Sequence, residues 1–139
     1  MKPPISVILE QASQIKNRAD RAKYLREHGS KPLMIILQYC FHPTVKWLLP
    51  EGAVPYKPMA KWDDQEGHLY LEARKLYLFV EGGYPGNLSQ KRREELFIQI
   101  LEGIHPQDAQ LLVSVKDKKM PYEGIDYSIV REAFPGVVP

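Results

Sequence analysis

Apolar residues recur at helical spacing along most of this sequence, and this pattern constrains the fold more than any other feature. Ile5, Ile8, Leu9 and Ala12 lie three or four positions apart, as they would on one face of an α-helix. The same period returns further along the chain. It predicts helices at about residues 4–16, 19–28, 31–42, 67–80, 89–103, 107–117 and 126–134. The expected fold class is therefore all-α, with six or seven helices around one core.

Turn-forming residues separate these segments and set their ends. Gly29 is a natural helix stop, and Ser30 can cap the next helix, in whose first turn Pro32 is tolerated. Residues 43–66 contain four prolines and Gly52, which predict a long Pro-rich loop with a short extended piece near residues 45–49. At 139 residues, the chain is expected to form a single domain over residues 1–139.

The charged residues are balanced overall but unevenly distributed. Nineteen Lys and Arg oppose 17 Asp and Glu, for a net charge of +2. Residues 1–61 carry ten basic against four acidic residues, whereas residues 62–83 carry two against five and residues 84–139 seven against eight. A basic first half can attract an anionic partner, although a solvated helix face would explain the same distribution.

The sequence contains no pattern typical of an active site. The four histidines (His28, His42, His68 and His105) are isolated, and no phosphate-binding loop or nucleophile elbow is present. We therefore expect no catalytic residue, no metal site and no cofactor. The one cysteine, Cys40, falls in an apolar run and is predicted to be a buried hydrophobe. Without a signal sequence or an apolar run of about 20 residues, the protein is expected in the cytoplasm and not in a membrane.

The C-terminal segment carries a resemblance to a known family. It reads Gly124-Ile125-Asp126-Tyr127-Ser128-Ile129-Val130-Arg131-Glu132-Ala133-Phe134-Pro135-Gly136-Val137-Val138-Pro139. This is similar to the end of the N-terminal helical DNA-binding domain of phage-type ATP-dependent DNA ligases, where a glycine, a small polar residue, a short helix and an aromatic-Pro-Gly-aliphatic-aliphatic-Pro tail recur. The preceding helices match in order and approximate length, so the resemblance covers nearly the whole chain and is poorest over residues 43–66.

The resemblance implies a DNA-binding module from a bacteriophage, acting in the cytoplasm of the host cell. In the ligases the tail leads into the adenylation domain, whereas this sequence ends at Pro139, so no ligase reaction is implied. The sequence also departs from the family. Arg131-Glu132 stands where the family tends to have Asn-Lys, and Glu123 and Asp126 lie where a phosphate would approach. Asp126 is a better helix cap than a phosphate ligand.

Two functional hypotheses follow. The leading one is a non-catalytic accessory protein that binds duplex DNA mainly through its backbone, with low sequence specificity, in phage replication or repair. The residues expected to contact DNA are Lys116, Lys118, Lys119, Gly124, Ser128, Arg131, Arg18, Arg21, Lys23, Lys91, Arg92 and Arg93.

The alternative is a protein-interaction module of the same fold that binds a phage or host protein, such as a replication or transcription component. Its anchors would be aromatic and apolar residues of the Pro-rich loop, since exposed aromatics make good interface anchors. These residues are Trp47, Tyr56, Met59 and Trp62. The competing interpretation is that the two tryptophans pack down over the helices.

Overall fold

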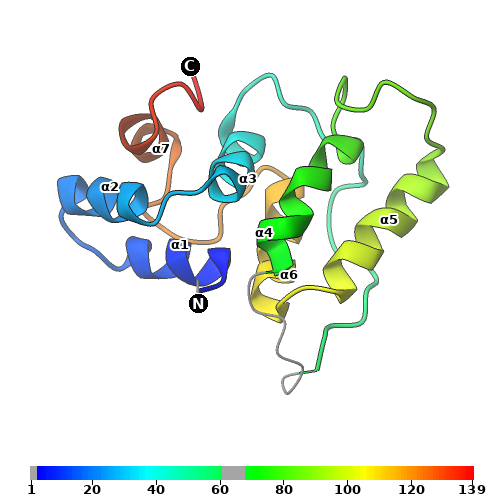
Figure 1. Ribbon diagram of the computed structural model, residues 1–139, viewed down its shortest axis with the longest axis horizontal. Helices are drawn as coiled ribbons and strands as arrows, with labels where there is room; N and C mark the ends of the chain where they lie inside the picture. The colour runs from blue at the N-terminus through cyan, green and yellow to red at the C-terminus, as the bar shows by residue number, and fades with distance from the viewer. Residues whose placement is uncertain (1–2, 61–67) are drawn as a thin grey trace.

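The computed structural model confirms the predicted all-α fold class (Figure 1). It describes residues 3–60 and 68–139. The helices are α1 (Ile5–Ser13), α2 (Arg18–Glu27), α3 (Lys31–Phe41), α4 (His68–Glu72), the 3₁₀-helix η1 (Ala73–Phe79), α5 (Gln90–Glu102), α6 (Pro106–Lys116) and α7 (Tyr127–Ala133). All of them lie within a few residues of their predicted positions.

Serines at the start of two predicted helices, Ser30 for residues 31–42 and Ser89 for residues 89–103, are expected as caps from the sequence, and both cap their helices. The Ser30 hydroxyl accepts a hydrogen bond from the backbone N–H of Leu33 at 3.2 Å, with Pro32 in the first turn of α3. The Ser89 hydroxyl accepts one from the N–H of Arg92 at 3.1 Å and begins α5. These short polar side chains satisfy N–H groups that have no partner within their own helix.

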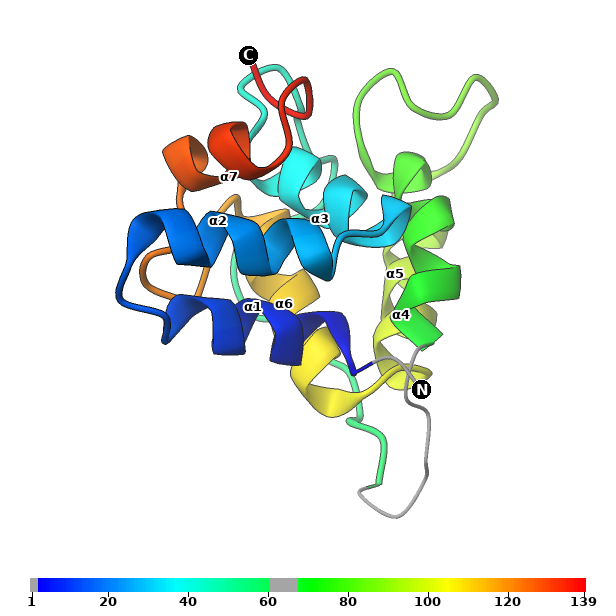
Figure 2. The ribbon, with the colours of Figure 1, turned by 60° about the vertical axis from the view of Figure 1, so that its left-hand side comes forward.

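Two groups of helices flank a central pair (Figures 1 and 2). α1, α2 and α7 pack together on one side, while α4, η1 and α5 lie on the other. α3 and α6 contact each other, and they also contact both flanking groups. α3 contributes the fully buried Leu33, Ile36 and Leu37, as its nearly all-round apolar sequence predicts.

The segment predicted as one helix over residues 67–80 is an α-helical turn followed by a 3₁₀-helix. Ala73, Leu76 and Phe79 are buried at intervals of three, and a 3₁₀-helix with three residues per turn places all of them on one face. The neighbouring residues at the same interval, Arg74 and Tyr77, are exposed. The geometry of η1 therefore separates a core face from a solvent face.

The segment between α3 and α4 is extended where it meets η1. Trp47 and Val80 form an isolated antiparallel bridge, in agreement with the extended piece predicted near residues 45–49. The Leu48 N–H donates to the Phe79 carbonyl and the Glu81 N–H to the Lys46 carbonyl, both at 2.8 Å.

Across the described ranges, none of the helices has the length and apolar character needed to span a membrane.

Candidate nucleic-acid interface

Two of the lysines predicted to contact DNA bind the Pro-rich loop instead. The Lys116 side chain is 1% exposed, and its Nζ donates to the carbonyls of Pro50 and Gly52 at 2.7 and 2.8 Å and to Asp117 Oδ1 at 2.7 Å. Lys118 Nζ donates to the carbonyls of His42 and Val45. In this structure both ammonium groups already have acceptors, and that of Lys116 is shielded from any phosphate. Lys119 is exposed and lies 4.0 Å from Glu51.

The loop explains why lysines occupy these positions. An irregular segment has backbone carbonyls with no partner in a helix or sheet, and these need donors when they are covered. An ammonium group offers three donors. Lys116 stands in the last turn of α6, where a cation is also favoured by the helix dipole. Lys116 and Lys118, at the end of α6 and just after it, therefore hold residues 42–52 in place.

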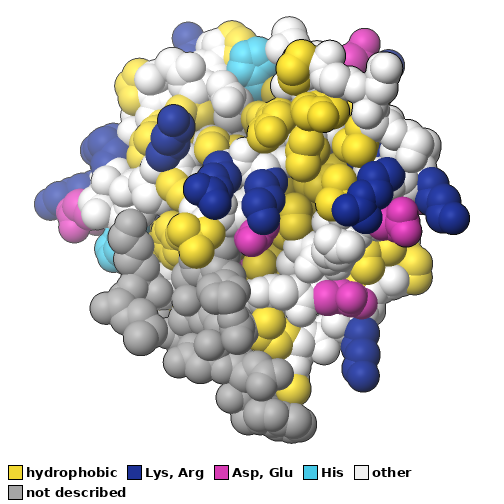
Figure 3. Space-filling model, turned by 45° about the vertical axis from the view of Figure 1, so that its right-hand side comes forward, with side chains coloured by type: hydrophobic (Ala, Val, Ile, Leu, Met, Phe, Trp, Pro, Cys, Tyr) yellow, Lys and Arg dark blue, Asp and Glu magenta, His cyan; other side chains and the backbone are white. Residues whose placement is uncertain are grey.

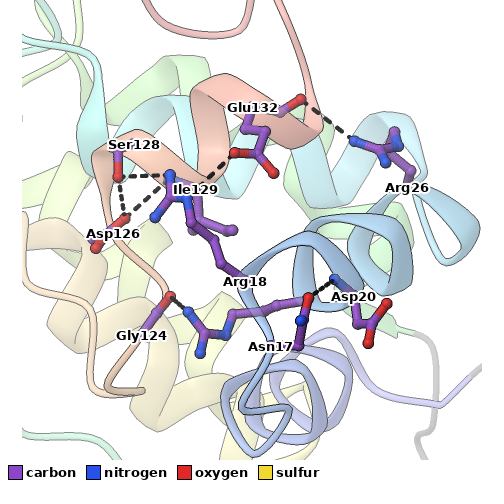
Figure 4. A network of polar contacts seen from close by, with 10 residues as sticks. Asn17, Arg18, Asp20, Arg26, Gly124, Asp126, Ser128, Ile129 and Glu132 are labelled. Atoms are coloured by element: carbon purple, nitrogen blue, oxygen red, sulfur yellow. Dashed lines mark hydrogen bonds and ion pairs between the residues drawn. The ribbon is translucent and has the colours of Figure 1, made fainter.

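A second set of predicted residues meets where α2 packs against α7 (Figure 4). Arg18 reaches from α2 to α7, where its Nη2 donates to the Ser128 hydroxyl at 2.9 Å and its Nε to Glu132 Oε1 at 3.2 Å. Arg21 donates to the carbonyls of Ile15 and Gly124, at 2.8 and 3.2 Å from its two Nη atoms. We call Arg18, Arg21, Gly124, Ser128 and Glu132 the α2–α7 corner.

Gly124 and Asp126 have local structural roles in this corner. Gly124 has a φ of +91°, and a Cβ there would lie 3.3 Å from the Arg21 guanidinium carbon. The group that the glycine admits is thus an arginine of the same chain. Asp126 Oδ1 accepts from the Ile129 N–H at 2.9 Å, which confirms its prediction as the cap of α7. This hydrogen bond holds the pKa of Asp126 below its usual range.

The first turn of α5 holds the third set, Lys91, Arg92 and Arg93. Arg93 is half-buried and donates to the carbonyls of Leu78 and Leu88, both at 3.3 Å. Lys91 and Arg92 are exposed, and neither forms an ion pair with any residue that the structure describes. No acid stands in this first turn, so the positive end of the helix dipole adds to two unneutralised cations.

η1 adds residues beside this turn that sequence reasoning missed. Arg74 is exposed and has no ion pair within the described ranges, whereas Lys75 pairs with Glu72 at 3.0 Å. Figure 3 shows Lys and Arg side chains in a row across this side of the molecule, next to hydrophobic side chains. We define the η1–α5 face as Leu71, Arg74, Tyr77, Tyr84, Lys91 and Arg92. The sequence contains a signal for the η1 part of this face: Ala73, Leu76 and Phe79 recur every three residues, so the residues between them face away from the core.

The remaining predicted residues are dispersed. Lys23 is exposed and lies 3.9 Å from Glu27 on the same helix. Arg131 is exposed on α7, and no ion pair links it to the described part of the chain. Neither residue extends the α2–α7 corner or the η1–α5 face.

Of the anchors predicted for a protein partner, Trp47 packs onto the helices. Its Nε1 donates to the Tyr39 carbonyl at 3.0 Å, and its ring meets Tyr39 and Phe97 edge-on. Tyr56 and Met59 are half-buried, and Trp62 lies outside the described residues. Trp47 therefore fits the interpretation in which the tryptophan covers the core.

Two kinds of group could support chemistry in such a fold, a metal-binding cluster and a reactive thiol. Within residues 3–60 and 68–139, no group of three or more His, Cys, Asp or Glu side chains is arranged to hold a metal ion. Cys40 is buried with a free thiol, as predicted, and burial raises its pKa to about 12. Such a thiol stays protonated and unreactive at neutral pH.

The described residues form a small all-helical protein whose surface includes the basic, partly aromatic η1–α5 face. The chain belongs to a family of unknown function (DUF6433), whose model matches residues 8–122. The match ends before the segment 124–139 on which the ligase resemblance depends. No curated protein and no solved structure matches the chain.

Proposed function

We propose that this protein binds DNA through the sugar–phosphate backbone and does so with its η1–α5 face. The supporting observation is that Arg74, Lys91 and Arg92 are exposed cations without a carboxylate partner in the described chain. Five of the other predicted cations bind carbonyls or carboxylates of the protein itself: Arg18, Arg21, Arg93, Lys116 and Lys118. Lys16, Lys31, Lys57 and Arg131 are likewise exposed without an ion pair in the described chain. The η1–α5 face differs from them because its cations share a surface with the exposed side chains of Tyr77 and Tyr84.

The position of Lys91 and Arg92 favours an anion. Cations at a helix N-terminus oppose the dipole, at a cost of about 0.3–1 kcal/mol each, and a bound phosphate removes this cost. Ser89 already accepts from the N–H groups of Arg92 and Arg93, so the first-turn N–H groups left for the same phosphate oxygens are those of Gln90 and Lys91. Contacts of this kind position a nucleic acid without reading its bases. We therefore propose low sequence specificity and no chemical step.

The proposed biological setting follows from the resemblance to the ligase domain. A relative of that domain would serve as an accessory protein in phage DNA replication or repair, in the host-cell cytoplasm. In this proposal the DNA surface has moved from the C-terminal motif to η1 and α5, because the arginines near that motif bind within the protein.

Fluorescence anisotropy with intact duplex, nicked duplex and single-stranded DNA, each at low and moderate salt, tests the proposal. With about three phosphate contacts, log K for duplex should fall by between two and three units per tenfold rise in salt. Lys91→Gln combined with Arg92→Gln should lower the duplex affinity and reduce this slope by about two.

The matched control is Lys16→Gln combined with Lys23→Gln, which removes the same charge from exposed positions in and before α2. This variant should bind duplex nearly as wild type does. An affinity that does not change with salt, or no binding at micromolar protein in low salt, would overturn the proposal. Equal losses in both double variants would show that net charge matters and the η1–α5 face does not.

A further inference from the structure

The large hydrophobic side chains that stand out as exposed in the described chain gather beside the free cations. Leu71 is 59% exposed, and Tyr77 and Tyr84 are each 40% exposed. All three belong to the end of α4, to η1 or to the loop that follows η1. Figure 3 shows a hydrophobic area of this kind directly beside the row of Lys and Arg. An apolar area bordered by cations indicates a surface with a particular partner.

The geometry of η1 explains why an arginine lies next to these apolar residues. Three residues per turn place Arg74 and Tyr77 one above the other on η1. Leu71 lies near the end of α4, which runs directly into η1. The core residues Ala73 and Leu76 occupy the next face. A cation therefore stands one turn away from an exposed aromatic ring.

The loop after η1 holds Tyr84 beside Tyr77. The two ring centroids are 6.3 Å apart with an interplanar angle of 47°. Gly86 lies against the Tyr84 ring, since a Cβ at Gly86 would come within 2.9 Å of three atoms of that side chain. Gly83 is equally close to η1, because a Cβ there would lie 2.2 Å from the Tyr77 carbonyl oxygen. Gly83 is thus required by its close approach to the backbone, whereas a side chain at Gly86 would displace the Tyr84 ring.

Arg93 joins this loop to the cationic turn of α5. Its guanidinium donates to the Leu78 carbonyl at the end of η1 and to the Leu88 carbonyl at the end of the loop. Its Nη1 also donates to Gln90 Oε1 at 2.7 Å. Arg93 is therefore a positioning residue that keeps the two tyrosines next to Lys91 and Arg92.

We infer that the η1–α5 face binds a single-stranded stretch of DNA, with bases stacked on Tyr77 and Tyr84 and phosphates bound by Arg74, Lys91 and Arg92. This inference rests on the proposed function and specifies its ligand. Every base has a flat face that can stack on an aromatic ring, and cations beside such rings track the backbone. In an intact duplex the bases stack on one another, so the tyrosines contribute little there. The cations complement the charge of a phosphate chain and would repel a basic partner.

The test compares three labelled ligands by fluorescence anisotropy at one salt concentration: a short oligothymidylate, an abasic oligonucleotide of the same length, and intact duplex. Wild type should bind oligothymidylate at least about tenfold more tightly than the abasic strand. Tyr77→Ala combined with Tyr84→Ala should lose this difference and keep its duplex affinity. Tyr77→Phe combined with Tyr84→Phe should retain it, because the rings remain.

Three results separate the possibilities. If the abasic strand binds as well as oligothymidylate, or if the alanine variant still prefers oligothymidylate, the stacking inference is wrong while backbone binding to DNA stands. If wild type binds none of the ligands, the proposed function itself fails. Equal binding of polyglutamate and oligothymidylate would assign the face to an acidic protein and overturn the inference. Unchanged thermal unfolding of the phenylalanine variant verifies that the fold is intact.

Discussion

The α2–α7 corner and the η1–α5 face both contain cations, but they use them differently. In the corner, Arg18 binds Ser128 and Glu132 of α7, and Arg21 binds backbone carbonyls. On the face, Arg74, Lys91 and Arg92 have no such partners among the described residues. The difference shows that a cluster of cations identifies a binding surface only when the acceptors around it are known.

Lys116, the last residue of α6, is a third kind of cation, because it is buried in the interior. Lys116 Nζ has two carbonyls and a carboxylate around it and is almost fully buried. A buried charge is stable only when it is paired and hydrogen-bonded in this way. Lys116 therefore belongs with the corner arginines as a group that holds the chain together.

The largest effect is expected when this interior cation is removed. Lys116→Met should lower the free energy of unfolding by about 3 kcal/mol, because it leaves a carboxylate and two carbonyls without their donor. Urea denaturation monitored by circular dichroism would measure this change. Lys119→Met removes an exposed lysine three residues away and should shift stability by no more than about 0.5 kcal/mol. If Lys116→Met and Lys119→Met had equal free energies of unfolding, the buried contacts of Lys116 would not stabilise the fold, and its distinction from an exposed lysine would be wrong.

A smaller loss of stability is expected in the corner. Arg21→Gln should lower the free energy of unfolding by about 1–2 kcal/mol, since it removes hydrogen bonds from a charged donor to the carbonyls of Ile15 and Gly124. Its affinity for duplex DNA should remain close to that of wild type. The double variant of Lys91 and Arg92 should show the converse, with unchanged stability and weaker DNA binding. A large loss of DNA affinity in Arg21→Gln would place the corner in the binding surface after all.

The sequence predicted the helices well because their apolar spacing and caps are local signals. Ser30, Ser89 and Asp126 cap the helices assigned to them, and only η1 differs in type. A 3₁₀-helix and an α-helix both place apolar residues three positions apart, so periodicity alone does not distinguish them. This ambiguity also concealed the exposed side of η1, with Arg74 and Tyr77.

The candidate site was predictable only in part. Lys91 and Arg92 follow from a basic first turn that is visible in the sequence. The internal roles of Lys116 and Arg21 do not, because their acceptors lie far away along the chain, at Pro50 and Gly124. A backbone carbonyl can come from any residue type, so no residue pattern indicates these contacts. The partners of a cation, and with them its availability, are set by the tertiary fold.

The smallest effect is expected from a substitution at Asp108. This residue has a buried carboxyl group, so it extends the comparison between internal and exposed charged groups to an acid. Its Oδ1 accepts from the Ser6 N–H at 2.9 Å, which supplies a cap to α1, where Pro4 has no capping side chain. Burial raises the pKa of Asp108 above its ordinary value of 3.8, although the hydrogen bonds of Ser6 and the charge of His105 act in the opposite direction.

The raised pKa makes the stability of the protein depend on pH in a defined direction. Below the ordinary pKa the carboxyl group is protonated in both the folded and the unfolded chain and has no effect. As the pH rises above that value, the unfolded chain ionises first, so the free energy of unfolding falls until the folded chain also ionises. Asp108→Asn keeps an acceptor for Ser6 and cannot ionise. Its melting temperature should therefore exceed that of wild type at neutral pH and approach it near pH 4, and the reverse order would show that the charged carboxylate stabilises α1.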